Sequence, residues 1–289
     1  MEIGIGLAIA VALLTNIASL LKHRGCQRTQ LVRIRQPVAS IRGLARSRWF
    51  VAGWGLAGVA WLAHVAALSL APISLVQTVL AGGAVTLAVL SQRLFGDRVE
   101  RRQWLALILG AAGLALLAAT LPRIQGAHSG FSLAAIASFE GGLVLLAAGI
   151  ALGHRAGRLA AKNGVPLAVL AGVLFALAGI AIKGLTGGAD SSVPLIASLV
   201  ALTLGCGALA QYTAVAALQS GGAIETIGLM GLVANAAQIV GGIIVFGDPL
   251  SPSPLGITLQ VTAFAMVCLS ALLMPSSADG ARGQVAAPA

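Results

Sequence analysis

Nine apolar stretches, each close to the length of a membrane span, constrain the fold of this chain more than any other feature. A helix that crosses the hydrocarbon core needs about 20 mostly apolar residues, because its backbone must be hydrogen-bonded without water. The stretches lie at 3–21, 49–71, 73–92, 104–121, 132–153, 164–183, 193–217, 222–245 and 255–274. We therefore predict an all-α integral membrane protein with about nine transmembrane helices.

Composition supports this prediction and excludes a soluble domain. Hydrophobic residues make up 58% of the chain and charged residues only 9%, a balance that a water-soluble surface cannot accommodate. Small residues recur in segments such as GWGLAG and LGAAGLALLAA. Because small side chains let helix backbones approach closely in lipid, these segments predict close helix packing.

The basic residues predict how the chain is oriented. Of the 18 lysines and arginines, all but Arg123 and Lys183 fall in the segments 22–48, 93–102 and 155–162 or in the tail. The positive-inside rule assigns those segments to the cytoplasm. We expect a multi-pass protein of the cell (inner) membrane, with the N-terminus outside and the C-terminus inside. The net charge of +10 is then an orientation signal, and we expect no nucleic-acid partner.

A short signature occurs twice and indicates an internal repeat. Phe95-Gly96-Asp97 returns as Phe246-Gly247-Asp248, 151 residues later, each time between two apolar stretches. The four spans of 1–121, which include the basic loop 22–48, then correspond to the four spans of 164–274. The span at 132–153 has no copy. Residues 275–289 form a small, polar tail that we expect to be disordered.

The repeat predicts two halves of opposite orientation. Five spans separate each element from its copy, and an odd number of crossings inverts the second copy. Inverted-topology repeats are common in secondary transporters, where the substrate site lies near the midplane between the halves. This arrangement puts the first FGD turn in the cytoplasm and the second outside, which accounts for the arginines that surround only the first.

The hairpin ALSLAPISLVQTVLAGGAVTLAVLSQRLFGDRVERRQWLALILGAAGLAL resembles the signature of the drug/metabolite transporter (DMT, EamA-like) superfamily. The basic loop after the first span and the Lys183-Gly184-Leu185 sequence look most like the NIPA-like branch, whose members are described as magnesium transporters. This chain has Trp61 and His64 where that branch has a Glu and an Asn. The resemblance implies membrane transport, with magnesium as one alternative.

Two ionisable residues inside spans are the leading candidates for a functional site. Glu140 is the only carboxylate well inside a span, and an acid placed there is costly enough to suggest proton coupling or cation binding. If the cargo is a metal ion, Glu140 is the candidate ligand. His64 lies in the outer half of the second span, where an imidazole can relay protons or donate one interhelical hydrogen bond.

Neutral polar and aromatic residues complete the candidate list. We expect the cavity to be lined by Gln77, Gln211, Asn235 and the repeat-related pair Trp61 and Tyr212. Amides in spans also hold helices together, and that interpretation stays open for each of them and for Asn16, Gln238 and Gln260. Glu225, in the first turn of its span, is interpreted as a helix cap.

The function predicted from the sequence is secondary transport of a small solute by alternating access, with proton or cation coupling. No nucleotide-binding GxxxxGK[ST] loop, HExxH or nucleophile elbow occurs, so we expect neither an enzyme nor a cofactor. Three scattered cysteines match no metal or redox motif. Two alternatives remain: a NIPA-like carrier of magnesium or other divalent cations, and a non-transporting membrane scaffold. Substrate, direction and oligomeric state are open.

Overall fold

The computed structural model describes residues 2–27, 29, 37–95, 100–120, 130–157, 164–187, 192–248 and 250–273. All of the regular secondary structure in these residues is α-helix, and no strand occurs among them. The helices are α1 (Glu2–Cys26), α2 (Pro37–Ala45), α3 (Arg48–Leu70), α4 (Ile73–Gly82), α5 (Ala84–Phe95), α6 (Arg101–Thr120), α7 (Leu133–Arg155), α8 (Val165–Thr186), α9 (Val193–Ser220), α10 (Ala223–Phe246) and α11 (Pro254–Leu273).

Seven spans in the described residues are long and apolar enough to cross a membrane. They are α1, α3, α4 together with α5, α7, α8, α9 and α10. The remaining apolar helices are α6 and α11, each of 20 residues. The prediction of an all-α membrane protein is therefore confirmed, and each of the nine predicted stretches is helical.

The structure differs from the predicted spans at two places. The third stretch is broken at Gly83, where the Asn16 side chain of α1 donates to the Gly83 carbonyl at 2.7 Å. The basic loop 22–48 is shorter than expected, since α1 continues to Cys26 and the loop contains α2. The tail 275–289 lies outside the described residues.

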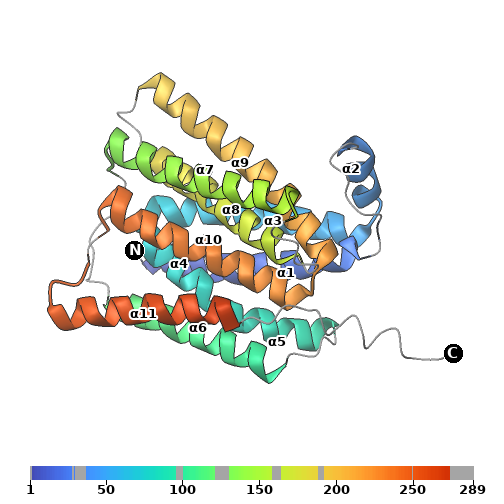
Figure 1. Ribbon diagram of the computed structural model, residues 1–289, viewed down its shortest axis with the longest axis horizontal. Helices are drawn as coiled ribbons and strands as arrows, with labels where there is room; N and C mark the ends of the chain where they lie inside the picture. Colours follow the sequence, from blue (N-terminus) through green and yellow to red (C-terminus); the bar gives the residue numbers. More distant parts are fainter. Residues whose placement is uncertain are drawn as a thin grey trace.

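The helices form one bundle in which most axes run along the same direction (Figure 1). The most extensive contacts between helices are those of α1 with α3, α8 with α9, α6 with α11, α8 with α10, and α4 with α10. In Figure 1, α9 and α7 lie along one side of the bundle, and α6 and α11 lie along the opposite side. Helix α7 packs against α8.

Glycines bring helix backbones close together at several of these contacts. A Cβ atom built on Gly113 of α6 would lie 2.8 Å from the Ala263 carbonyl oxygen of α11, and one on Gly53 of α3 would lie 2.8 Å from the Ala18 oxygen of α1. No side chain fits at such distances. The small residues therefore act as the sequence predicts, because they permit close contact where lipid provides no hydrophobic driving force.

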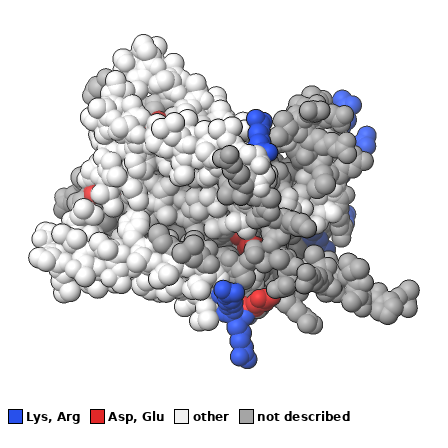
Figure 2. All heavy atoms as spheres, in the orientation of Figure 1, with Lys and Arg blue, Asp and Glu red and all other residues white. Residues whose placement is uncertain are grey.

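Charged side chains cover little of the described surface on the face shown in Figure 2. Figure 2 shows white surface over most of the visible face, with lysine and arginine gathered toward the right-hand end and below its centre. Figure 1 places α2 at that right-hand end. Exposed apolar side chains such as Leu145 (75%) and Val193 (79%) cover the long helices. This distribution suits a bundle embedded in lipid.

The close approach of the two backbones at Gly113 allows the α6–α11 contact to be tested by mutation. Replacing Gly113 with Leu should lower stability by about 1–3 kcal/mol, since the added side chain must separate two packed backbones. Gly149→Leu on α7 is the matched control, because nothing lies within 4 Å of its Cβ position. Thermal unfolding of the detergent-solubilised protein measures both, and equal melting temperatures for the two variants would contradict the packing.

Candidate functional site

A lysine is completely buried near the end of α8, where it binds the end of another helix. Lys183 has an exposed fraction of 0%. Its ammonium donates to the carbonyl oxygens of Leu68 at 2.8 Å and Ala71 at 3.0 Å. These carbonyls belong to the last turn of α3, whose final carbonyls lack partners within the helix and carry the negative end of its dipole. A buried cation is well suited to that position.

Asp248 binds the helix that begins just after this turn. Its Oδ2 accepts a hydrogen bond from the backbone N–H of Ser74 at 3.0 Å, in the first turn of α4. Asp248 and Lys183 thus bind opposite ends of the same turn, the carboxylate at the start of α4 and the ammonium at the end of α3. Asp248 is 2% exposed. We call the side chains of Lys183 and Asp248, with the three backbone groups that they bind, the Lys183–Asp248 clasp.

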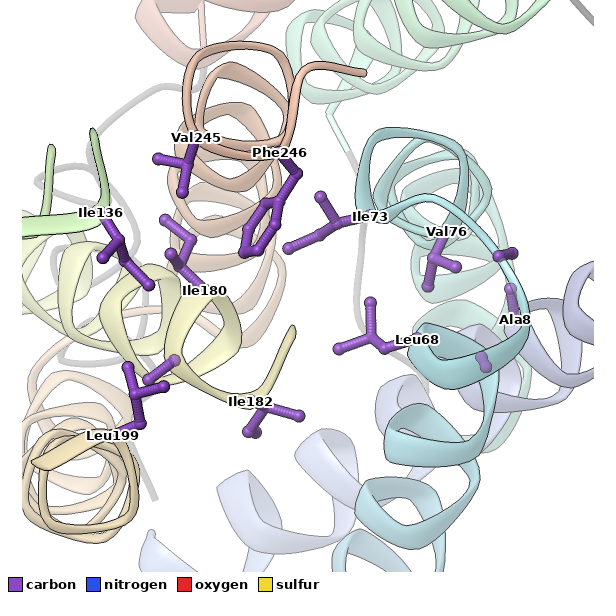
Figure 3. Close-up of a cluster of buried hydrophobic side chains, with 13 residues drawn as sticks. Ala8, Leu68, Ile73, Val76, Ile136, Ile180, Ile182, Leu199, Val245 and Phe246 are labelled. Atoms are coloured by element: carbon purple, nitrogen blue, oxygen red, sulfur yellow. The ribbon is translucent and has the colours of Figure 1, made fainter. Parts of the chain in front are cut away.

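The second FGD signature builds this clasp. Phe246 is buried in the core, where Figure 3 shows its ring directed toward Ile73 of α4, with Ile180 of α8 nearby. Gly247 has φ +64°, a left-handed conformation that glycine adopts readily at a helix C-terminus. The reversal brings the Asp248 N–H to the Gly242 carbonyl at 3.0 Å and turns its carboxylate toward α4. The first FGD continues into residues outside the described part.

A hydrogen-bonded pair of glutamines joins α4 to α10. The Gln77 amide donates to the Gln238 side-chain oxygen at 2.9 Å, and the two residues are 1% and 5% exposed. Gly179 of α8 makes room for this pair, because a Cβ atom there would overlap the Gln238 amide. The Gln77 oxygen has no partner in the described residues. The predicted cavity candidate Gln77 thus lies at a helix contact, with one acceptor atom unused.

Glu140 is buried at 8% exposure on α7, and its Oε1 has no hydrogen-bond partner in the described part of the chain. Ile136 of α7 and Leu199 of α9 both reach Gly184 of α8. Thr203 of α9 has a buried Oγ1 that is likewise unpartnered among the described residues.

His64 and Trp61 lie on α3 and do not join this group. The His64 side chain is half-buried, and its Nδ1 atom is buried with no partner in the described residues. Trp61 is 49% exposed, on a face that meets lipid in a membrane. Helix α8 packs against both α3, which carries His64, and α7, which carries Glu140.

The candidates on α9 and α10 occupy different surroundings. Gln211 accepts a hydrogen bond from the Lys22 ammonium of α1 at 3.4 Å, which sequence reasoning did not anticipate. Tyr212 and Asn235 are half-buried. Glu225 lies in the first turn of α10 with 2% exposure, the position expected for a helix cap.

Sequence reasoning did not include Lys183 and Asp248 among the candidate site residues. It places Lys183 on the outer side and Asp248 in a turn signature. One signal was available: Asp97 aligns with Asp248 under the 151-residue shift, and Lys22 aligns with Lys183 if the first loop carries an insertion of about ten residues. Charged residues at matching positions in apolar segments are costly, which makes them candidates for a specific role.

No family model, curated protein or solved structure matches this chain in comparisons with known proteins. Within the described residues, no group of three or more histidine, cysteine, aspartate or glutamate side chains could hold a metal ion. The function of this site is therefore inferred from the residues of this chain alone.

The contact of Gly179 with Gln238 predicts non-additive mutations. Gly179→Ala should destabilise the protein, because its methyl group collides with the Gln238 amide, and Gln238→Ala should remove that collision while leaving the Gln77 amide unpaired. We expect the double variant to be more stable than the sum of the single changes by about 0.5–3 kcal/mol. Thermal unfolding of all four proteins measures this coupling, and additive losses would contradict the contact.

Proposed function

We propose that the protein is a secondary transporter of the cell membrane that moves a small solute by alternating access between two inverted halves. One half comprises α1, α3, α4–α5 and α6, and the other comprises α8, α9, α10 and α11. Together with the unpaired α7 they make nine spans, as in the drug/metabolite transporters that the sequence resembles. The N-terminus is outside, and the C-terminus is in the cytoplasm.

The pattern of helix packing carries this proposal. Under the 151-residue shift, α4 and α6 correspond to α10 and α11, and each packs against its own copy. If the first loop carries an insertion of about ten residues, α1 corresponds to α8, so that the pair α1–α3 corresponds to α8–α9 and α1–α4 corresponds to α8–α10. A single two-fold axis in the membrane plane would account for both the two contacts between copies and the two pairs of equivalent contacts. Such an axis relates the halves of many secondary transporters.

The interface between the halves supplies the features that a transport path needs. The interrupted helix α4–α5 lies in the first half, and transporter sites are often built from discontinuous helices near the midplane. The Gln77–Gln238 hydrogen bond crosses from α4 to α10. Amide groups at this position can exchange their mutual hydrogen bond for bonds to a polar solute.

Glu140 is our candidate for the coupling group. A carboxyl group buried in an apolar helix without a partner is stable when protonated and needs compensation when ionised. Binding and release of a proton at Glu140 would therefore change the contacts of α7 with α8 and α9. Thr203 can accept a hydrogen bond from the protonated form or donate to the carboxylate.

The magnesium alternative is favoured by one observation, that Glu140 of α7 and Thr203 of α9 each have a buried oxygen atom without a partner in the described residues. Magnesium needs about six oxygen ligands, several of which are usually water. A carrier of this kind would move magnesium into vesicles without any organic solute. A non-transporting scaffold would move neither.

Replacing Glu140 with Gln tests the coupling role. Purified protein in vesicles containing a pH-sensitive dye is mixed with pools of small solutes, and solute entry and proton movement are recorded together. We expect Glu140→Gln to abolish solute-driven proton movement while preserving exchange of labelled for unlabelled solute. Glu100→Gln, in an exposed residue before α6, is the control and should behave as the unmodified protein.

Retention of proton coupling in Glu140→Gln would disprove the role of this carboxyl group. Magnesium entry in place of solute entry, followed with a magnesium-sensitive dye, would favour the alternative carrier. Absence of all fluxes across a broad solute set would favour the scaffold.

A further inference from the structure

We propose that the Lys183–Asp248 clasp is the gate that closes the outer side of the protein, and that Lys22 is its counterpart on the cytoplasmic side. The inference rests on the proposed arrangement of two inverted halves. It goes beyond that arrangement by naming the contacts that form when one side is shut and that break when it opens.

The clasp joins the two halves at a single turn. Lys183 and Asp248 belong to the second half, and the α3–α4 turn that they bind belongs to the first. The ammonium holds the end of α3, and the carboxylate holds the start of α4. Because the two charged side chains hold both helix ends, the turn cannot move away from α8 and α10 without breaking these three hydrogen bonds.

The surroundings of the clasp are closely packed and apolar. Ile73, which lies with Asp248 next to Gly242, is 0% exposed, and Phe246 is 4% exposed. Figure 3 shows Ile73 and Leu68 on the first-half side of this core and Phe246 and Ile180 on the other side. The apolar side chains thus meet across the contact between the halves, and we expect them to exclude water while the clasp is engaged.

Two buried polar atoms at the clasp lack hydrogen-bond partners in the described residues, and this favours opening. The second Asp248 oxygen, Oδ1, and the Ser74 hydroxyl oxygen are buried without hydrogen-bond partners among the described residues. Buried polar atoms that lack partners raise the free energy of the state that contains them. Opening toward water would hydrate both atoms and so offset part of the loss of the three hydrogen bonds to the α3–α4 turn.

The corresponding lysine of the first half is disengaged. Lys22 aligns with Lys183, yet its ammonium makes a 3.4 Å hydrogen bond to the Gln211 side chain of α9 instead of binding main-chain carbonyls. The Leu218 carbonyl, in the last turn of α9, accepts from the Gln27 side chain at 3.4 Å. One lysine therefore binds the end of a helix while its copy does not, which is the asymmetry that alternating access requires.

In the opposite state we expect the two lysines to exchange roles. Lys22 would bind the carbonyls at the end of α9, close to the α9–α10 turn, and Lys183 would leave those of α3. The Gln211 amide, already in contact with Lys22, lies about two helical turns before the Leu218 carbonyl, so we expect the exchange to include a movement of α1 relative to α9.

Electron spin resonance distance measurements test the gate in the full-length protein. Spin labels at Leu70 and Leu250, exposed at 43% and 48%, report the outer side in a background with the three cysteines changed to Ser. Labels at Arg93 and Ser220 report the inner side. We expect Lys183→Met to raise the population with long outer distances at least about tenfold, because loss of the ammonium leaves two buried carbonyls of the closed state without their hydrogen bonds. The inner distances should shorten in the same sample.

Lys22→Met is the matched control, since it makes the same substitution in the other half. We expect it to leave the outer distances unchanged. Asp248→Asn should open the outer side less than Asp248→Ala, because an Asn side chain can still bind the Ser74 N–H. The double variant Lys183→Asp with Asp248→Lys exchanges the two charges. It should not restore closure, since the carboxylate would then face the carbonyls at the end of α3 and the ammonium would face the N–H groups at the start of α4.

Unchanged outer distances in folded Lys183→Met, or closure restored by the exchanged pair, would overturn the proposal. Hydrogen exchange of the unmodified protein provides a test that needs no substitution. The amides of the α3–α4 turn should exchange at least about tenfold more slowly than those of the α9–α10 turn, and equal rates would contradict the asymmetry. Neither measurement requires a substrate, so a failure of the transport assay leaves the gate testable, and a failed gate leaves transport testable.

Discussion

The ammonium of Lys183 at the end of α3 is the interaction on which the arrangement of this protein depends. Inside a bilayer, the last carbonyls of one helix and the first N–H groups of the next have no water to bind. At the α3–α4 turn, Lys183 binds the first set and Asp248 binds the second. Their charges match the ends of the two helix dipoles, and the pair as a whole is neutral. The same two residues thus satisfy the backbone and hold the halves together.

Other polar side chains in the described part of the protein act in a similar way. Asn16 donates to the Gly83 carbonyl at the break between α4 and α5, and Gln260 of α11 donates to the Thr120 carbonyl at the end of α6. These amides were open to two interpretations, as cavity lining or as contacts between helices, and the second applies to both. Glu140 and Thr203 differ, because their buried oxygens have no partner in the described residues. That contrast is why we assign the coupling role to Glu140.

Much of the fold could be predicted because it depends on apolar length alone. The nine stretches are helical, and the small residues at Gly53 and Gly113 lie at close helix contacts. The face on which a residue lies could not be predicted in the same way. Helix α3 is apolar on all sides, so nothing in its periodicity distinguishes exposed Trp61 from half-buried His64. The break at Gly83 depends on Asn16, which is 67 residues away in sequence. Partners this distant leave no local signal.

The two FGD turns offer the most direct measurement of the central claim, that the halves are inverted. A single cysteine at Leu250, after the second turn, or at Glu100, after the first, is introduced into cysteine-free protein in intact cells and treated with a membrane-impermeant maleimide. The account predicts that the cysteine at position 250 reacts from outside, and that the one at position 100 reacts only after the membrane is opened. Reaction of both from the same side would contradict the inverted repeat.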